Sequence, residues 1–300
     1  MKTCLTIAVG LAFAVAAVCA QNLPTYQGII SGQSPYYYNS LDGTYTPTIG
    51  TGTLVPSAND TGFGSDYFGN AGDALYFTDT VARATDAIGT HEIYNSGVAN
   101  ANSIGSMSFM FYVPTNALTS TSARYIFDNG DSSPDDFYLK MSNSVLLLAV
   151  GNISTITNAT SLVPGTWYYW AATWNFSGAN SSAYGINWYL GAAGGSVTSL
   201  TSGFKQRGGS GNISSSAILG SGSTFELSGQ PAGSGGFQIS GVPGLVDEVA
   251  TWSNQLNVAQ IDSQYDALII VPEPATLALV GIGGLFLLFG RGTFRRRVSR

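Results

Sequence analysis

The densest group of metal-binding side chains is a set of aspartates near the middle of the chain. Four of them lie within nine residues, among turn-forming residues: Asp128, Asp131, Asp135 and Asp136. Carboxylate oxygens are the ligands that Ca²⁺ prefers, and it takes about six to eight of them. The spacing is not that of an EF-hand. The sequence therefore predicts a calcium site on chemical grounds, with a solvated acidic turn as the alternative.

Carboxyl pairs are the other chemistry to look for, because glycoside hydrolysis needs two carboxyl groups about 5–9.5 Å apart. Between residues 21 and 270 the glutamates are Glu92, Glu226 and Glu248, each in a different segment. Asp247 precedes Glu248 directly, so on a regular strand their side chains should point to opposite faces. The lone His91 sits in a polar loop, where a solvated histidine is expected. We therefore expect no catalytic residues and no enzyme activity.

Short segments in which apolar and polar residues alternate are expected to form the strands that position these groups. Residues 106–113 alternate with period two and are ended by Pro114, and residues 168–174 and 244–252 also have strand character. Further strands are predicted at 74–77, 124–128, 137–141, 145–150, 186–191, 217–219 and 225–227. Val258 to Leu268 has helical spacing. This pattern predicts an all-β, two-sheet antiparallel sandwich with one closing helix.

Charge and cysteine content exclude several classes of function. Residues 21–270 hold 16 of the 17 acidic and 5 of the 11 basic residues, which gives a net charge of about −11. Nucleic acid binding requires a basic face, so no nucleic acid partner is expected. The two cysteines, Cys4 and Cys19, both lie near the N-terminus, so residues 21–270 have no thiol or disulfide.

The order of the motifs is similar to a known fold family. The segments SMSFMFYV, GTWYYWAATWN, INWYLGA and GLVDEVATWSNQLNVAQIDSQY resemble the laminin-G-like, concanavalin A-like jelly roll over residues 70–268. The resemblance implies a jelly-roll sandwich whose loops bind glycans or proteins, sometimes through calcium. Glucanases of this fold carry a pattern like E-x-D-x-x-E on one strand, which this sequence lacks. Residues 21–69 are expected to be an irregular lead-in, packed on the sandwich.

The tryptophans are the natural sugar-stacking candidates: Trp167, Trp170, Trp174, Trp188 and Trp252. On alternating strands most of them should belong to the core. A tryptophan or tyrosine at the rim could stack on a sugar, and the sequence leaves open which one.

The N-terminus reads as a signal peptide over residues 1–20. Lys2 precedes an apolar stretch from Leu5 to Val18, and cleavage is expected after Ala20. Cys19 raises a lipoprotein alternative, for which the preceding Val18 fits poorly.

The C-terminus contains a second apolar segment, residues 275–290, which is uncharged and rich in glycine. As a helix it would reach about 24 Å, slightly less than the roughly 30 Å hydrocarbon core, and a short span can cross by local thinning. A cluster of arginines follows and should stay cytoplasmic: Arg291, Arg295, Arg296 and Arg297. The alternative, a buried core helix with a basic tail, would require a polar face that this segment lacks.

Residues 271–300 resemble the PEP-CTERM sorting signal of Gram-negative bacteria that make extracellular polysaccharide. The signature is Pro272, Glu273 and Pro274 within residues 271–274, followed by the span and the arginine-rich tail 291–300. The resemblance implies recognition by an exosortase, cleavage near the motif, and transfer from an inner-membrane intermediate to the envelope or its matrix. The three motif residues would then serve the processing enzyme.

These observations favour an exported cell-envelope or matrix protein whose sandwich binds a polysaccharide or a surface protein without catalysis. A purely structural surface protein without a specific ligand, or a diverged glycoside hydrolase, are the alternatives.

Overall fold

The computed structural model describes about half of the residues of the predicted sandwich. Described are residues 25–50, 61–77, 104–114, 124–128, 137–142, 145–150, 153–175, 185–194, 200–206, 226–227 and 244–269. The signal peptide, the sorting motif, the C-terminal span and the arginine tail lie outside these residues. Within the described part of the chain, no helix has the length and apolarity needed to cross a membrane.

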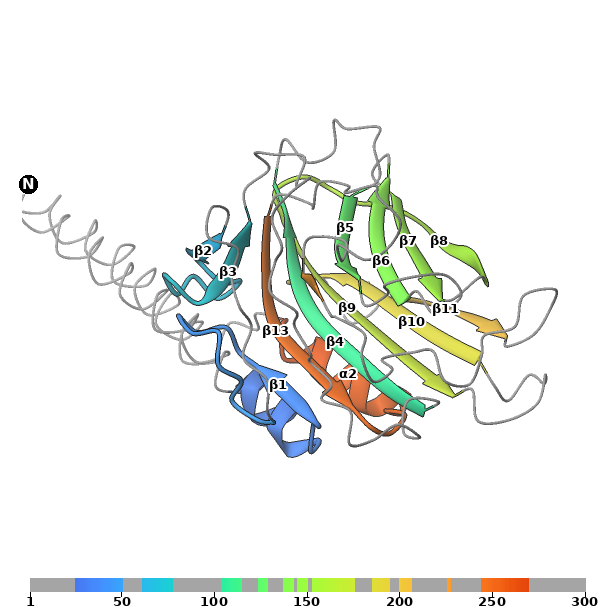
Figure 1. Cartoon of the computed structure of the whole chain (residues 1–300), viewed down its shortest axis with the longest axis horizontal. Coiled ribbons are helices and arrows are strands. Elements are labelled where there is room, and N and C mark those ends of the chain that lie inside the picture. The colour runs from blue at the N-terminus through green and yellow to red at the C-terminus, as the bar shows by residue number, and fades with distance from the viewer. Residues whose placement is uncertain are drawn as a thin grey trace, which may run out of the picture.

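Two antiparallel sheets make up the fold (Figure 1). The larger sheet has eight strands: β1 (Tyr37–Asn39), β2 (Thr61–Gly64), β3 (Ala74–Phe77), β4 (Ile104–Val113), β9 (Thr166–Asn175), β10 (Gly185–Ala192), β11 (Thr201–Gln206) and β13 (Gly244–Trp252). The smaller sheet has five: β5 (Arg124–Asp128), β6 (Phe137–Ser142), β7 (Val145–Val150), β8 (Ile153–Ser161) and β12 (Glu226–Leu227). The predicted all-β sandwich is confirmed at this level.

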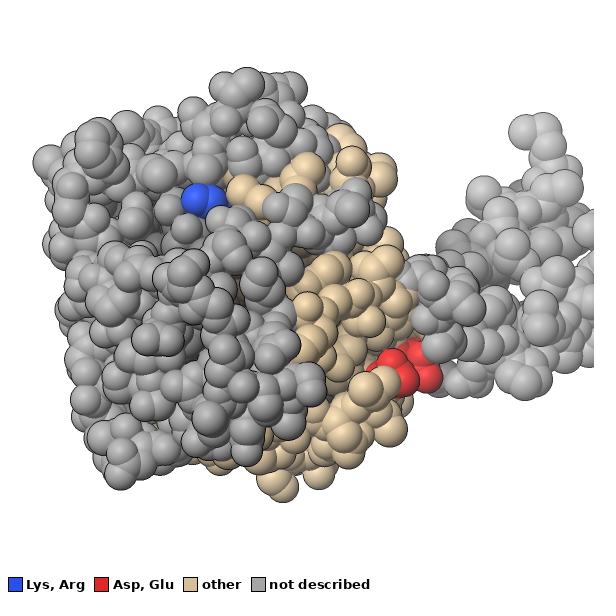
Figure 2. All heavy atoms as spheres, turned by 90° about the vertical axis from the view of Figure 1, so that its right-hand side faces the viewer, with Lys and Arg blue, Asp and Glu red and all other residues tan. Residues whose placement is uncertain are grey.

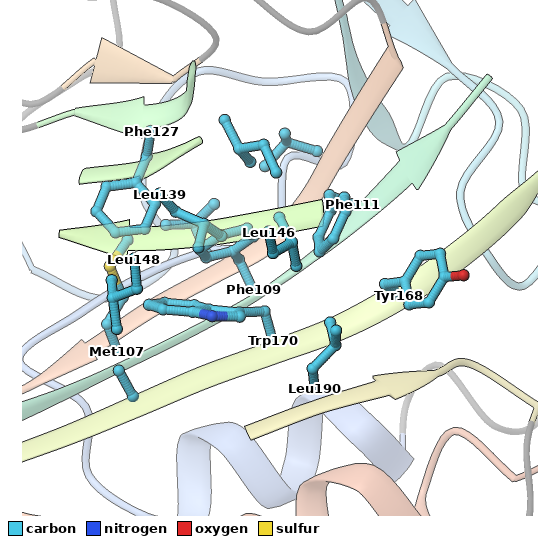
Figure 3. Packing of buried hydrophobic residues seen from close by; sticks show 14 of the residues in the cluster. Met107, Phe109, Phe111, Phe127, Leu139, Leu146, Leu148, Tyr168, Trp170 and Leu190 are labelled. Atoms are coloured by element: carbon cyan, nitrogen blue, oxygen red, sulfur yellow. The ribbon is translucent and has the colours of Figure 1, made fainter. Parts of the chain in front are cut away.

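The main core lies between the two sheets. Figure 3 shows Phe109 and Trp170 of the larger sheet pointing toward Phe127, Leu139 and other apolar side chains of the smaller one. The ring centroids of Phe109 and Trp170 are 5.0 Å apart, and Phe127 meets Phe109 edge-on at 5.6 Å. Offset and edge-to-face contacts of this kind add to the stability that apolar burial provides. We call this side of the larger sheet its inner face.

The opposite, outer face of the larger sheet is also largely covered, by a second apolar cluster. Helix α2 (Val258–Asp266) contributes Ile261 and Tyr265, and the helical residues 25–32 contribute Tyr26 and Ile30. Asn257 and Gln260 form a reciprocal capping box that fixes where α2 begins. The larger sheet is therefore buried on both faces over much of its area.

Strand β13 is the element on which the segments near the N-terminus converge. One edge of β13 pairs with β4, and the other pairs first with β3, through residues 244–246, and then with β1, through residues 249–251. Figure 1 shows β3 and β1 along the same side of β13, one beyond the other. β1 and β2 come from the predicted lead-in, and both extend the larger sheet.

The strands and the helix predicted within the described residues are all present. The turn before β9 contains Gly165, whose φ of +76° suits glycine, as the glycine-tryptophan pattern indicated. β8, β11 and the helical residues 25–32 were not predicted. The expected strand at 217–219 lies outside the described residues.

Candidate functional site

The five tryptophans divide into buried and accessible ones. Trp170, Trp174 and Trp252 are buried, as expected for core residues. Trp167 and Trp188 are partly exposed. Trp188 packs at the margin of the inner core, so close to Gly203 that a Cβ there would lie 2.6 Å from the indole. Trp167 lies on the outer face, beside the second cluster. These two are the tryptophans that could stack on a ligand.

Trp167 ends a row of side chains that crosses four strands. The register places Tyr76 of β3 opposite Leu245 of β13, Leu245 opposite Tyr112 of β4, and Tyr112 opposite Trp167 of β9. Directly opposed residues in an antiparallel pair project from the same face. All four side chains therefore lie on the outer face, and we call them the outer row.

The outer row is accessible to solvent although most of the outer face is covered. Tyr76 is 43% exposed, and the other three members are partly exposed. The rings of Tyr112 and Trp167 are in contact, with centroids 5.6 Å apart and planes tilted by 50°. Three interstrand intervals of about 4.8 Å give the row a length of roughly 14 Å.

Small residues border the outer row at both ends. Gly62 of β2 lies opposite Tyr76, and a Cβ placed there would meet no atom within 4 Å. At the other end the carbonyl oxygen of Trp167 accepts a 2.8 Å hydrogen bond from the amide of Ala193. The row is therefore open at its Gly62 end, whereas at its Trp167 end the hydroxyl of Tyr67 lies beside Gly194.

Two carboxyl groups lie near the outer row, in the middle of β13. The pairing of β13 with β4 is irregular between Asp247 and Ala250, and Glu248 has a φ of +56°, as a bulged residue can. We predicted that Asp247 and Glu248 point to opposite faces. That prediction is wrong, because the extra residue of the bulge breaks the alternation. Both carboxyls lie on the outer-face side, within electrostatic range of Tyr26.

The carboxyl pair, Asp247 and Glu248, is enclosed by residues 25–50, which we call the N-terminal segment. Glu248 is fully buried and accepts hydrogen bonds from the hydroxyl of Tyr38 and, at 3.2 Å, from the side-chain amide of Gln27. Asp247 Oδ1 accepts the backbone N–H of Glu248 at 2.9 Å. Its Oδ2 has no hydrogen-bond partner among the described residues. The pair thus sits where β1 and β3 meet along β13, and it links the N-terminal segment to the sheet.

Burial dominates the electrostatics of the pair. Loss of solvation raises the pKa of Glu248 to about 8, against the opposing effect of the hydrogen bonds from Tyr38 and Gln27. Loss of solvation, and then the charge of Glu248, raise the pKa of Asp247 well above its usual range. Protonation of the pair is therefore favoured in the folded protein. A polysaccharide cannot reach carboxyl groups whose exposed fractions are 0% and 1%.

Further acidic residues lie around the pair. We call Asp42, Asp66 and Asp73 the acidic flank, since their carboxylates act electrostatically on one another or on the pair. Lys140, on the smaller sheet, is the one lysine or arginine whose side chain the structure describes. Figure 2 shows the side of the molecule opposite β2 and β3, where the described acidic atoms lie together and apart from the described basic atoms.

The predicted calcium loop lies outside the part of the chain that can be assessed. Asp131, Asp135 and Asp136 are not among the described residues, and only the backbone of Asp128 is described. Calcium binding there stays a prediction. Among the described residues, no group of three or more acidic, histidine or cysteine side chains is arranged to hold a metal ion. His91 also lies outside the described residues, and the side chain of Glu226 is not described.

Comparison with known families identifies a motif near the C-terminus. Residues 271–297 match the family model described as the PEP-CTERM protein-sorting motif. The chain carries a PEP-CTERM sorting motif. The resemblance seen in Pro272, Glu273 and Pro274 is thereby confirmed. The motif implies a protein that is exported, processed by an exosortase and sorted through the membrane to the cell surface. No protein with a curated function matches the chain.

The solved structures that are similar to the chain share little sequence identity with it. The CBM40 domain of Ruminococcus gnavus IT-sialidase, bound to α2,3-sialyllactose, has a TM-score of 0.37 and 12% identity, over 54% of this chain and 82% of that one. The binding domain of botulinum neurotoxin serotype D has a TM-score of 0.45 and 11% identity, over 79% of this chain and 52% of that one. A leech intramolecular trans-sialidase has a TM-score of 0.36 and 16% identity, over 55% of this chain and 24% of that one.

Proposed function

We propose that this chain is an exosortase-sorted surface or matrix protein whose sandwich, of the laminin-G-like, concanavalin A-like class, binds a glycan without cleaving it. The outer row carries the proposal. It is a partly exposed line of apolar side chains, three of them aromatic, on a face that is otherwise largely covered. Exposed apolar strips of this kind commonly mark sites of interaction.

The chemistry of the outer row suits a sugar chain. Aromatic rings offer a flat apolar surface to the C–H faces of pyranose rings, while the tyrosine hydroxyl and the indole N–H can reach sugar hydroxyls. Successive members of the row are separated by one interstrand interval, about the length of one pyranose unit in an extended polysaccharide. A sugar chain crossing the strands could therefore place successive rings over Tyr112 and Trp167, and a further ring over Tyr76 beyond Leu245.

Burial of the carboxyl pair supports a non-catalytic role. Hydrolysis requires both carboxyls to contact the scissile bond, directly or through one water. Asp247 and Glu248 are instead enclosed by Tyr38, Gln27 and Tyr26. Their described contacts join the N-terminal segment to β13, which is a structural task.

Binding to polysaccharide tests the proposal. Residues 21–270 would be screened against immobilised glycans, with and without EDTA, since calcium could contribute through the predicted loop. Trp167→Ala and Tyr112→Ala should each weaken binding about tenfold, which corresponds to ~1.4 kcal/mol. Phe204→Ala is the matched control. Phe204 is an exposed aromatic residue, and its register leads through Asn187 to Thr173, six residues or about 20 Å along β9 from Trp167.

The outcomes separate the proposed function from its alternatives. Equal loss in all three variants, or none, would remove the outer row as the site. Silence on every glycan would leave a purely structural surface protein. Turnover of any glycan by the purified chain would contradict the non-catalytic assignment.

A further inference from the structure

The charges around the outer row restrict which glycans it can take. Resting on the proposed function, we propose that the outer row selects uncharged polysaccharide and rejects glycans that carry carboxylate or sulfate groups. The selection comes from the acidic flank and from the shortage of basic groups among the described side chains, rather than from hydrogen bonds to a particular sugar.

Position along the strands brings the acidic flank close to the row. Asp73 immediately precedes β3 and is three residues from Tyr76, a distance of about 10 Å along an extended chain. Asp66 follows β2 by two residues, at the end of the hairpin where Gly64 pairs with Ala74. These separations are comparable to the Debye length of about 10 Å at 0.1 M salt. An anionic sugar on Tyr76 would therefore be repelled.

A second acidic group lies along β13. Asp247 is two residues from Leu245, on the same face of the sheet. Because its carboxyl is buried and its protonation is favoured, it adds less negative charge than the partly exposed Asp73. Because the carboxyl is enclosed, a ligand anion on the row cannot accept a hydrogen bond from it. Asp247 therefore offers such an anion no compensating contact.

Recognition of an acidic sugar usually needs a basic partner. Arginine or lysine pairs with a carboxylate or sulfate through charge-assisted hydrogen bonds. Lys140 is the lysine or arginine with a described side chain, and it belongs to β6 of the other sheet. The sequence agrees, because residues 21–270 carry 5 basic residues against 16 acidic ones. Among the described side chains, none therefore supplies a basic partner that would compensate the desolvation of an anionic group on the row.

Matched ligands provide the test. The affinity of residues 21–270 for a neutral hexose oligosaccharide would be compared with that for the uronic acid oligosaccharide of the same linkage and length, at about 20 mM and 300 mM salt. We expect the neutral ligand to bind at least about fivefold more tightly at low salt, and the difference to shrink at high salt.

Removing one charge of the acidic flank makes the test specific. Asp73→Asn should raise the affinity for the uronate about twofold at low salt and leave that for the neutral ligand unchanged. The control is Glu226→Gln on β12, a strand of the smaller sheet, where Glu226 pairs with Asp128 of β5. Both variants should keep the circular dichroism spectrum of the parent.

Each result bears on one of the two proposals. Equal or tighter binding of the uronate, or an Asp73→Asn variant indistinguishable from Glu226→Gln, would overturn the selection while the glycan-binding function stands. Failure to bind either ligand class would overturn the proposed function, and the selection with it.

Discussion

Glu248 is a buried carboxyl group whose hydrogen-bond donors, Tyr38 and Gln27, both come from the N-terminal segment. Burial raises its pKa to about 8, from an ordinary value near 4.5. A carboxyl group with a raised pKa binds its proton more tightly in the folded state than in the unfolded state. Its contribution to stability is therefore complete below about pH 4.5 and is lost as the pH rises through about 8.

The free energy of unfolding should accordingly fall as the pH rises from about 5 to 8. Glu248→Gln removes the titrating group and keeps a side chain that can pair with Gln27 and Tyr38. We expect this variant to be more stable than the parent at pH 8, by roughly 2 kcal/mol or more, and to show a flatter profile, because each pKa unit corresponds to about 1.4 kcal/mol. Urea unfolding at several pH values measures this.

Asp266→Asn, on the exposed end of α2, is the control and should run parallel to the parent. A Glu248→Gln profile with the same slope as the parent would show that Glu248 is not the group responsible. Glu248→Ala would leave the two donors without this acceptor and should destabilise the protein by about 1–3 kcal/mol near pH 5, with a smaller deficit at pH 8 because the titrating group is gone.

Little of the structure around the carboxyl pair could be predicted from the sequence. Asp247 and Glu248 are visible as neighbours, but strand alternation predicts opposite faces, and nothing local signals a bulge. Tyr38 is 210 residues from Glu248, and Gln27 is 221 residues from it. The outer row was equally unpredictable, since Tyr76, Leu245 and Tyr112 become neighbours only through the register of three strands. Tryptophan was recognised as a stacking candidate, and only the exposure of Trp167 and Trp188 could narrow the choice.

At the scale of elements, α2 and β10 are in close contact. A Cβ on Gly191 would lie 2.5–2.7 Å from the ring and hydroxyl of Tyr265, whose hydroxyl donates to the carbonyl of Ala192 at 2.7 Å. Real Cβ contacts are not this short, so the helix would have to shift. Glycine at this position therefore sets how closely α2 can pack on the sheet.

Gly191→Ala should lower the free energy of unfolding by about 1–3 kcal/mol, as overpacking of a core does. Gly62→Ala, on β2 where a Cβ meets no atom within 4 Å, is the matched control and should be neutral or slightly stabilising. Chemical denaturation of both variants gives the comparison. A Gly191→Ala protein as stable as the control would show that the contact is looser than described.

Elements with strong local patterns were predictable, and the others were not. β4, β9 and β13 have clear apolar alternation, and α2 has apolar residues at helical spacing. β8 reads ISTITNATS and β11 reads TSGFKQ, so both have few apolar residues and depend on pairing with their neighbours. The helical residues 25–32 include Gly28 and Gly32, which disfavour a helix locally, but Tyr26 and Ile30 are buried on the sheet.

At the scale of the whole molecule, the sorting motif predicts how the chain is processed. In a host with an exosortase, the intact mass of the mature protein should correspond to a chain beginning at Gln21 and shortened near residues 271–274. Replacement of Pro272, Glu273 and Pro274 by alanine should leave the C-terminal span attached and raise the measured mass. Unaltered processing of that variant would show that the motif is not what the enzyme recognises.

The central place of β13 has a consequence for the order of folding. This strand lies near the end of the sequence, yet β1, β3 and β4 all pair with it. Contacts this far apart in sequence form late and slowly. The segments nearest the N-terminus cannot complete their pairing until residue 252 has emerged, so the protein becomes fully folded only when the segment just before its sorting motif is outside the membrane.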